Sequence, residues 1–208
     1  MTRSKLNAGG GKDRVLKEAT RLFVSKGYAA TSMAQVAEAA EMQKASLYHH
    51  FKSKEALFIA CVSNGYEGVI AKLTAARDTP GISHEKKLRT ALGAVHDHVV
   101  SSPVGAMSPT IAETSRAIPA VARSFWDLHI SAMHEITGKI IDDGVTEGAF
   151  RRLDPTVLEL FVFGPIVYVS LSNQMFGRFD DLASHFDPEK TKAKHIDEVC
   201  KLLQVSGP

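Results

Sequence analysis

The sequence predicts an all-α protein of about nine helices, arranged as a small amino-terminal three-helix unit followed by a larger helical unit. Along most of the 208 residues, apolar side chains recur every three or four positions, which is the period of a helix with one buried face. No segment shows the strict alternation of apolar and polar residues that indicates a half-buried strand. Proline and glycine clusters divide the apolar segments, so we expect many short helices packed against one another.

The composition is that of a folded chain with a basic amino-terminal quarter. Hydrophobic residues make up 44% and charged residues 23%, which provides enough apolar surface for a sizeable core. Residues 1–60 contain 10 Lys or Arg and 5 Asp or Glu, a balance of +5; the rest contains 15 and 18, a balance of −3, and the sum is the net charge of +2. This distribution predicts contact with a polyanion at the amino-terminal end.

Cysteine usage and hydropathy predict a cytoplasmic protein without a membrane span. Cys61 and Cys200 lie far apart in the sequence, so a disulfide framework is not expected. The amino-terminal residues lack the apolar run of a signal peptide. The longest uncharged stretch, residues 160–177, reaches the lower length limit of a membrane span, but Pro165 and several polar side chains interrupt it. We therefore expect a buried helix of a soluble protein at this position.

The first two helices are indicated by their apolar spacing and their end signals. Residues 1–12 include three consecutive glycines and predict a flexible basic arm. From residue 13 a helical stripe begins and ends at Lys26-Gly27, and its members are Val15, Leu16, Ala19, Leu22 and Phe23. Ser32 and Gln35 then form a capping box, which predicts a second helix of about two turns that ends near Ala40.

The stretch 43–51 predicts a third short helix with two different faces. Leu47 and Phe51 lie one turn apart, with His50 beside them, and we expect these three to anchor the helix in the core. The opposite arc carries polar and small side chains suited to phosphates and base edges, namely Lys44, Ala45, Ser46, Tyr48 and His49. Two short helices joined by a tight turn are the pattern of a helix-turn-helix. An ordinary amphipathic surface helix is the alternative.

Everything after this stretch also reads as helical. Ser53 is a suitable N-cap for a helix that ends near residue 77, and no Gly/Ser-rich linker separates it from the first three helices. The apolar spacing then predicts helices at about 88–99, around Ile111, at 119–146, at 158–176 with a possible bend at Gly164-Pro165, and at 188–203. Because the helix at 158–176 is apolar on every side, it must be covered on more than one side, and a partner subunit is an economical cover.

Two motifs in the basic quarter carry a family resemblance. The first is Phe23-Val24-Ser25-Lys26-Gly27-Tyr28 followed by Ala30-Thr31-Ser32-Met33, and the second is Leu47-Tyr48-His49-His50-Phe51-Lys52-Ser53-Lys54-Glu55-Ala56-Leu57. Together they resemble the DNA-binding domain of the TetR family of bacterial transcriptional repressors, over residues 15–57. The resemblance implies an arm at 1–12, a helix-turn-helix domain at 13–53, and a ligand-binding and dimerisation domain at 54–208.

The resemblance also implies the partners and the DNA contacts. It implies a homodimer, formed through about 156–177 and 188–204, that binds a palindromic double-stranded operator and releases it when a small, often apolar molecule binds. The DNA-contacting positions that it implies are Thr31, Ser32, Gln43, Lys44, Ala45, Ser46, Tyr48, His49 and Lys54. In this chain Glu41 stands where the turn usually has glycine, and Gln43 stands where the recognition helix usually begins with serine or threonine. Both departures affect the pose of that helix.

The effector pocket is the least specific part of the prediction. Its candidates are Met107, Ile111, Phe125, Trp126, His129, Met133 and Phe163, with His96 as a less certain member, although each alone is equally compatible with core packing. No metal set is indicated, because His96 and His98 face opposite sides of a helix. Neither a cofactor nor a catalytic motif is predicted. The alternatives are a regulator of the same fold without a small-molecule effector or with a protein partner, and a helical enzyme.

Overall fold

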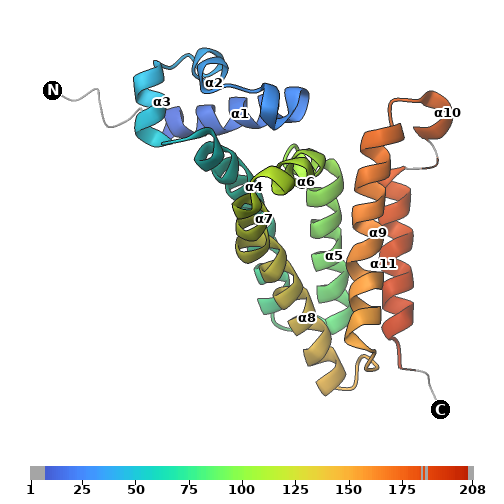
Figure 1. Ribbon diagram of the computed structural model, residues 1–208. Helices are drawn as coiled ribbons and strands as arrows, with labels where there is room; N and C mark the ends of the chain where they lie inside the picture. Colours follow the sequence, from blue (N-terminus) through green and yellow to red (C-terminus); the bar gives the residue numbers. More distant parts are fainter. Residues whose placement is uncertain (1–7, 184, 186, 206–208) are drawn as a thin grey trace.

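The computed structural model describes residues 8–183, 185 and 187–205, and the described chain is helical apart from turns and one isolated antiparallel bridge between Phe150 and Gln204 (Figure 1). The all-α fold class is therefore confirmed. The elements are α1 (Ala8–Ala30), α2 (Met33–Ala39), α3 (Lys44–His50), α4 (Lys54–Asp78), α5 (His84–Ser101), a 3-10 turn (Gly105–Met107), α6 (Ser108–Ala117), α7 (Pro119–Phe125), a π-helical segment (Trp126–Ile130), α8 (Ser131–Thr146), α9 (Pro155–Phe176), α10 (Asp180–Ala183) and α11 (Pro188–Leu203).

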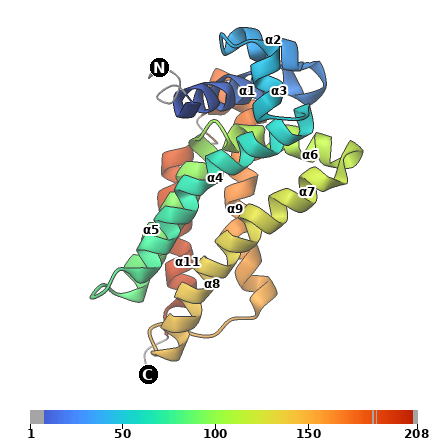
Figure 2. The same cartoon turned by 90° about the vertical axis from the view of Figure 1, so that its left-hand side faces the viewer.

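The helices are arranged as a small unit at one end of an elongated body. Helices α1, α2 and α3 lie together at that end, and α4 runs from them into the body (Figure 1). Figure 2 shows α7 and α8 following one another along the side of the body that α4 also occupies. Helices α9 and α11 lie side by side along the other edge, and α5 packs against both of them.

Helix α1 begins earlier than the sequence pattern indicates. It starts at Ala8, so residues 8–12 belong to its first turns and not to a flexible arm, and residues 1–7 of the predicted arm lie outside the described residues. Gly11 in this first part of the helix lies beside the Met42 side chain, where an added Cβ would stand 3.4 Å from it. The predicted stop at Gly27 is present as a break with φ +79°, a backbone conformation that glycine adopts without steric cost.

An aromatic cluster joins α1 to α4. The Phe23 ring meets the Phe58 ring edge-on at a centroid distance of 4.9 Å, and the Tyr28 ring meets Phe58 at 5.2 Å. Phe23 and Phe58 are both fully buried. Aromatic pairs of this geometry add about 0.5–1.5 kcal/mol beyond the area they bury, so the first helix and the fourth are expected to move as one body.

The long helix predicted at 119–146 is interrupted. Its start at Pro119 and its end at Thr146 are as expected, but residues 126–130 form a π-helical turn between α7 and α8. A π turn contains an extra residue, which rotates the side chains that follow it out of the α-helical phase. The sequence pattern assumed one uninterrupted phase, and Trp126 and His129 were both candidates for the effector pocket. In the structure Trp126 is 49% exposed and His129 is 6% exposed.

Helix α9 is covered on one face only. Its buried side packs toward α5 through Val162, Ile166 and Val169, and the Ser170 hydroxyl donates to the Val99 carbonyl at 2.8 Å. The other face leaves large apolar side chains exposed, and these are Val157, Leu160, Phe161, Val167, Tyr168, Leu171 and Met175. Helices α4 and α9 both have the length and composition of a membrane span, and 28% of the apolar window of α9 is buried. The expectation that residues 160–177 are buried is therefore wrong within the single chain.

Two imidazole rings that hydrogen-bond to one another connect α5 and α11 to the backbone of α9 near Pro165. Proline has no N–H, so the carbonyl of Phe161, one turn earlier, lacks its usual helical donor. His195 Nε2 lies 2.7 Å from this carbonyl and donates to it, while His195 Nδ1 accepts from His96 Nε2 at 2.7 Å. His96 Nδ1 is then an unprotonated, buried nitrogen without a partner among the described residues. This arrangement stabilises two neutral histidines.

Buried neutral histidines make the fold sensitive to acid. Burial lowers the pKa of His96 and of His98 from 6.5 to about 4. At pH values between about 4 and 6.5 the folded chain binds fewer protons than the unfolded chain, so the free energy of unfolding falls as the pH falls. We expect the free energy of unfolding, measured by urea denaturation, to drop by roughly 2 kcal/mol per histidine from pH 7 to pH 5. His98→Leu should remove the part of this pH dependence that His98 contributes. A free energy of unfolding that does not change between pH 7 and pH 5 would contradict this account.

Candidate nucleic-acid interface and cavities

The second helix begins with the predicted capping box. The Gln35 backbone N–H donates to Ser32 Oγ at 3.2 Å, and the Ser32 backbone N–H donates to Gln35 Oε1 at 2.9 Å. Met33, Val36 and Ala37 are buried beneath α2. The reciprocal bonds satisfy two backbone donors that would otherwise lack partners at the helix start, and they fix the direction in which α2 leaves α1.

The turn between α2 and α3 is closed by two backbone hydrogen bonds. The Met42 N–H donates to the Ala37 carbonyl at 2.8 Å and the Glu41 N–H donates to the Glu38 carbonyl at 3.0 Å. This is the Schellman pattern, in which the residue after the C-cap takes a left-handed conformation. Glu41 occupies that position with φ +49°, so the turn keeps the backbone shape that glycine usually supplies, at a cost of about 1 kcal/mol.

Helix α3 is anchored by two apolar residues. Leu47 is fully buried and Phe51, its C-cap, is 5% exposed. The prediction that His50 shares this role is wrong, because His50 is exposed and its ring contacts only the neighbouring rings of His49 and Phe51 among the described aromatic residues. On a helix of seven residues the buried arc is too narrow to include a third position beside Leu47.

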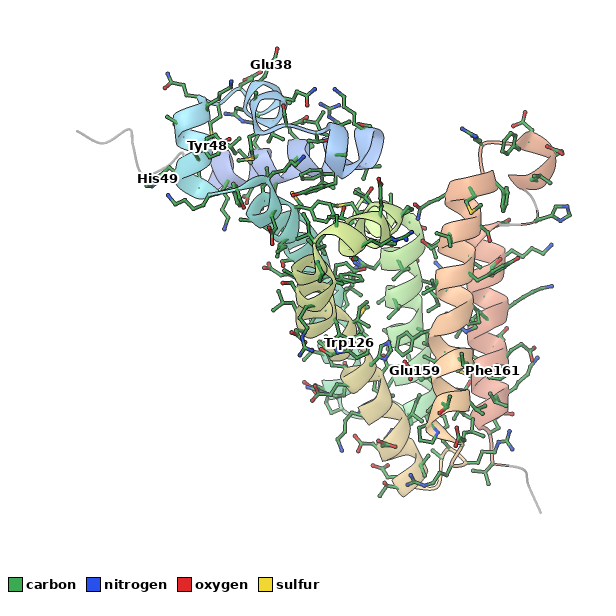
Figure 3. The ribbon with its side chains drawn as sticks, viewed as in Figure 1. Glu38, Tyr48, His49, Trp126, Glu159 and Phe161 are labelled. Carbon is green, nitrogen blue, oxygen red and sulfur yellow. The ribbon has the colours of Figure 1, made fainter. Side chains whose placement is uncertain are left out.

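The rest of α3 forms an exposed polar arc. Gln43 is the N-cap residue but makes no side-chain capping bond, so its amide group remains available. The residues that follow it on this arc are all exposed, and they are Lys44, Ala45, Ser46, Tyr48 and His49. Figure 3 shows Tyr48 and His49 pointing away from the body of the molecule. A cation, a hydroxyl and an amide presented on a short anchored helix can contact phosphates and base edges in a major groove.

Two residues predicted to contact phosphate are engaged inside the protein. Thr31 is 1% exposed, and its hydroxyl lies 2.8 Å from the Gly27 carbonyl, to which it donates. The Lys54 ammonium donates to the carbonyls of Tyr28 at 2.9 Å and Thr31 at 3.0 Å, and it lies 4.3 Å from the centre of the Tyr28 ring. Ser32 remains exposed, although its hydroxyl belongs to the capping box. The geometry thus assigns Thr31 and Lys54 a role in fixing the junction of α1, α2 and α4.

The candidate effector residues are not gathered in one cavity. Ile111, Phe125 and His129 line a space of only about 10 Å³, whereas Met107 and Met133 are core residues that line neither this space nor the three larger hollows of about 260, 500 and 530 Å³. His129 Nε2 lies 3.2 Å from Ser63 Oγ, and its ring stacks on Tyr66. His96, the less certain candidate, is occupied by its bond to His195.

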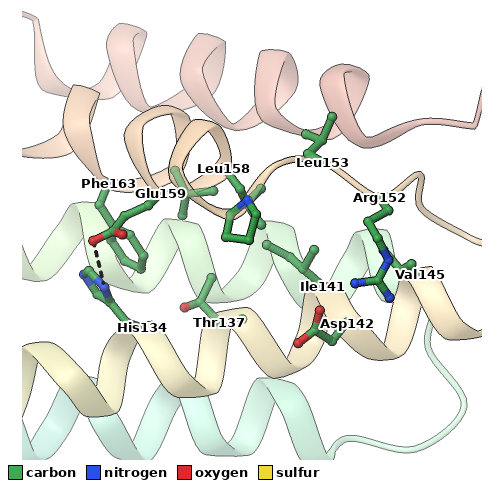
Figure 4. Close-up of a pocket in the computed structure, with 13 residues that line it drawn as sticks. His134, Thr137, Ile141, Asp142, Val145, Arg152, Leu153, Leu158, Glu159 and Phe163 are labelled. Atoms are coloured by element: carbon green, nitrogen blue, oxygen red, sulfur yellow. Dashed lines mark ion pairs between the residues drawn. The ribbon is translucent and has the colours of Figure 1, made fainter.

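A larger cavity of about 260 Å³ lies between α8 and α9 (Figure 4). It includes one of the predicted residues, Phe163, whose ring stacks on His134 at a centroid distance of 4.0 Å. The lining also contains residues that the sequence pattern did not single out, and they are Thr137, Gly138, Ile141, Asp142, Val145, Arg152, Leu153, Pro155, Leu158, Glu159 and Val162. Most of them recur at helical spacing on the facing sides of α8 and α9, but that spacing alone does not show that the two helices face one another.

Among the described residues, no group of three or more His, Cys, Asp or Glu side chains is placed to hold a metal ion. Cys61 and Cys200 are both buried and unpaired, and burial raises the pKa of the Cys61 thiol to about 12. A thiol in that state is a poor nucleophile.

The anchored third helix, its tight turn and its exposed polar arc define a helix-turn-helix DNA-binding protein. A family model described as "Bacterial regulatory proteins, tetR family" matches residues 15–61, which include α2, α3 and the start of α4. Residues 15–61 therefore match this family, and the comparisons support a regulator of this type.

Individual relatives support the assignment. The chain is 24% identical over 188 residues to the uncharacterized HTH-type transcriptional regulator YuxN of Bacillus subtilis, an alignment that covers 86% of this chain and 65% of YuxN. It is 32% identical over 98 residues to the HTH-type transcriptional regulator TcmR of Streptomyces glaucescens, covering 46% of this chain and 43% of TcmR. The chain thus spans less than two thirds of both curated relatives.

The fold extends beyond the matched domain. The crystal structure of the transcriptional regulator FadR from Bacillus subtilis in complex with stearoyl-CoA superimposes with a TM-score of 0.75 at 14% identity, over 92% of this chain and 99% of that one. At this identity the likeness concerns the fold alone, and it includes the carboxy-terminal helices that the family model does not match.

Proposed function

We propose that the chain is a cytoplasmic transcriptional regulator that binds operator DNA as a homodimer and changes its DNA affinity when a small molecule binds in the carboxy-terminal region. The exposed polar arc of α3 carries the proposal, because it is held rigidly by Leu47 and Phe51 and bears the side chains that read base edges. Members of the TetR family bind DNA operators and small-molecule effectors.

The geometry of α3 supports different roles for its residues on the DNA. The face at Gln43, Lys44, Ala45 and Ser46 lies at the amino-terminal end of the helix, which enters the groove first in this class of motif. Tyr48 projects farther along the helix and is suited to a phosphate. Lys54 stabilises this surface indirectly. Its ammonium group donates to carbonyls at the end of α1 and so holds that end against the start of α4.

The uncovered face of α9 supports the homodimer. Its exposed apolar side chains include Leu160, Val167 and Leu171, which are 63%, 58% and 44% exposed. Apolar side chains concentrated on one helix face favour association, and the same face on a second copy related by a two-fold axis is the simplest complement. A two-fold dimer carries two recognition helices and therefore fits a palindromic operator with half-sites about 34–36 Å apart.

Substitutions at Gln43 and Lys54 should have different effects. Gln43→Ala is expected to change the base preference, because the free amide can pair with adenine N6 and N7 and contributes about 1–3 kcal/mol of discrimination. Lys54→Ala is expected to weaken binding to all duplexes by a similar factor and to lower the melting temperature, since it removes the bonds to the Tyr28 and Thr31 carbonyls. Selection of bound fragments from a random duplex library checks the base preference, and binding titrations with a thermal melt check Lys54→Ala. An unchanged preference in Gln43→Ala would show that Gln43 does not read a base.

The effector response can be followed with the single tryptophan. The Trp126 ring lies 5.8 Å from that of His134, which lines the cavity between α8 and α9. A ligand that enters this cavity should therefore change the fluorescence of Trp126. A compound that alters DNA affinity without changing the Trp126 fluorescence would bind elsewhere, and a regulator that responds to no small molecule would show neither change.

A further inference from the structure

The cavity between α8 and α9 contains a buried hydroxyl group without a partner. Thr137 is 1% exposed, and its Oγ1 makes no hydrogen bond with any described residue. Threonines on helices commonly donate to a backbone carbonyl one turn earlier, as Thr90 and Thr146 do in this protein. A buried hydroxyl without a partner costs about 1–3 kcal/mol. Thr137 lines the cavity between His134 and Ile141 (Figure 4), and its hydroxyl is buried just behind the wall, from where a rotation about the Cα–Cβ bond can turn it toward a bound molecule.

The residue next to Thr137 leaves space at the same wall. Gly138 lies in the interior of α8, where glycine costs about 1 kcal/mol relative to alanine. A Cβ atom built on Gly138 would meet no other atom within 4 Å, so close packing does not require glycine at this position. The missing side chain widens the cavity beside the Thr137 hydroxyl.

The size and the walls of the cavity indicate a flat, mostly apolar ligand. An apolar cavity of about 150 Å³ accommodates benzene, so 260 Å³ suits a molecule of about two fused rings. The stacked rings of His134 and Phe163, with an interplanar angle of 10°, form one flat wall. The other apolar contacts come from Ile141, Leu158 and Val162.

The charges around the cavity favour an uncharged ligand. Glu159 and Asp142 contribute two carboxylates and Arg152 one guanidinium group, so the lining carries a formal charge of −1. Burial lowers the pKa of His134, which is therefore neutral at pH 7 and adds no positive charge. His134 Nδ1 lies 3.4 Å from Glu159 Oε1, and this contact occupies the Glu159 carboxylate at one end of the cavity (Figure 4). An anionic ligand would meet net repulsion.

We propose that this cavity binds an uncharged two-ring organic molecule with one hydrogen-bonding oxygen, and that Thr137 recognises this oxygen. Two other hollows, of about 500 and 530 Å³, lie against α11 and α1. They are larger, but neither is lined by a buried, unpartnered hydroxyl among the described residues. The α8–α9 cavity alone combines space, a flat apolar wall and an unused polar group.

The test uses two probes of nearly equal shape, 2-naphthol and 2-methylnaphthalene, with the full-length dimer and isothermal titration calorimetry. We expect the wild-type protein to bind 2-naphthol about three- to tenfold more tightly than 2-methylnaphthalene, which is the difference that one hydrogen bond makes. Thr137→Val keeps the shape of the side chain and should abolish the preference. Anionic 2-naphthoate should bind more weakly than 2-naphthol.

A second variant locates the binding site. Gly138→Leu fills the cavity and should abolish binding of both probes, whereas its stability should not decrease, because leucine is a better helix former than glycine. Gly68→Leu is the matched control: this glycine lies on an exposed side of α4 with open space around its Cβ position, and its substitution should leave binding unchanged. The proposal is overturned if neither probe binds, if wild-type protein does not prefer 2-naphthol, or if Gly138→Leu binds as wild type does.

Only the regulatory consequence of this site rests on the proposed function. If the calorimetry gives the expected pattern and operator affinity does not change with bound 2-naphthol, the site stands and the effector response through it fails. If a compound changes operator affinity equally in wild type and Gly138→Leu, the effector response stands and this cavity is not its site.

Discussion

Leu171→Glu should convert the proposed dimer into monomers. Leu171 lies in the exposed apolar face of α9 and is 44% exposed in the single chain, so glutamate is tolerated by the monomer. In a dimer the same residue would be buried against the partner, where an unpaired carboxylate is strongly unfavourable. Because a monomer engages only one half-site at a time, operator affinity is expected to fall by at least about 100-fold. Sedimentation velocity and fluorescence anisotropy measure the two effects.

The control for this variant is Leu128→Glu. Leu128 is an exposed leucine of the π-helical segment, 54% exposed, and this segment packs against α4, α7 and α8. The same substitution there should leave both the dimer and the DNA affinity unchanged. Equal loss in both variants would mean that the effect is one of general stability, and a fully dimeric Leu171→Glu protein would exclude α9 as the interface.

The second large effect is expected for Ser46→Glu. Ser46 is exposed at the third position of α3, where glutamate is favourable for the helix itself, so the fold should be retained. On DNA the new carboxylate would face phosphates or base edges across the groove. We expect affinity for every duplex to fall by roughly 100-fold or more, because the variant loses polar contacts and adds like-charge repulsion.

Thr90→Glu provides the charge-matched control. Thr90 is an exposed residue of α5, in the body of the molecule, and the substitution changes the net charge from +2 by the same amount as Ser46→Glu does. Anisotropy titrations at one salt concentration should show nearly wild-type binding for Thr90→Glu. A similar loss in both variants would attribute the effect to overall charge and would remove α3 from the interface.

The features that the sequence predicted well are those determined by neighbouring residues. The capping box of Ser32 and Gln35, the N-cap at Ser53 and the last helix at Pro188–Leu203 are all present, because each depends on bonds or spacing within a few residues. The sequence left open whether Glu41 would keep the left-handed conformation of the usual glycine, and the structure shows that it does, with φ +49°.

The features that the sequence did not predict depend on packing between distant segments. The π-helical turn at Trp126–Ile130 has no local sequence signal, and its first residue, Trp126, is exposed. Lys54 looks like a surface cation in the sequence, yet the carbonyls of Tyr28 and Thr31 converge on it only after α1 and α4 have packed.

The site between α8 and α9 was missed for a related reason. Thr137 and Gly138 are ordinary members of a helical pattern until the position of α9 is known. The unused hydroxyl of Thr137 and the open space at Gly138 are properties of the packed structure, and a pattern of apolar residues does not report them.

The central claim is that two copies of this chain read a palindromic duplex through α3. Sedimentation of the protein with a duplex chosen by selection from a random library tests it most directly, when the titration is repeated at several salt concentrations. We expect two chains per duplex, a symmetric selected sequence and an affinity that falls steeply as salt is raised. One chain per duplex, or the absence of any enriched sequence together with salt-independent binding, would contradict the account.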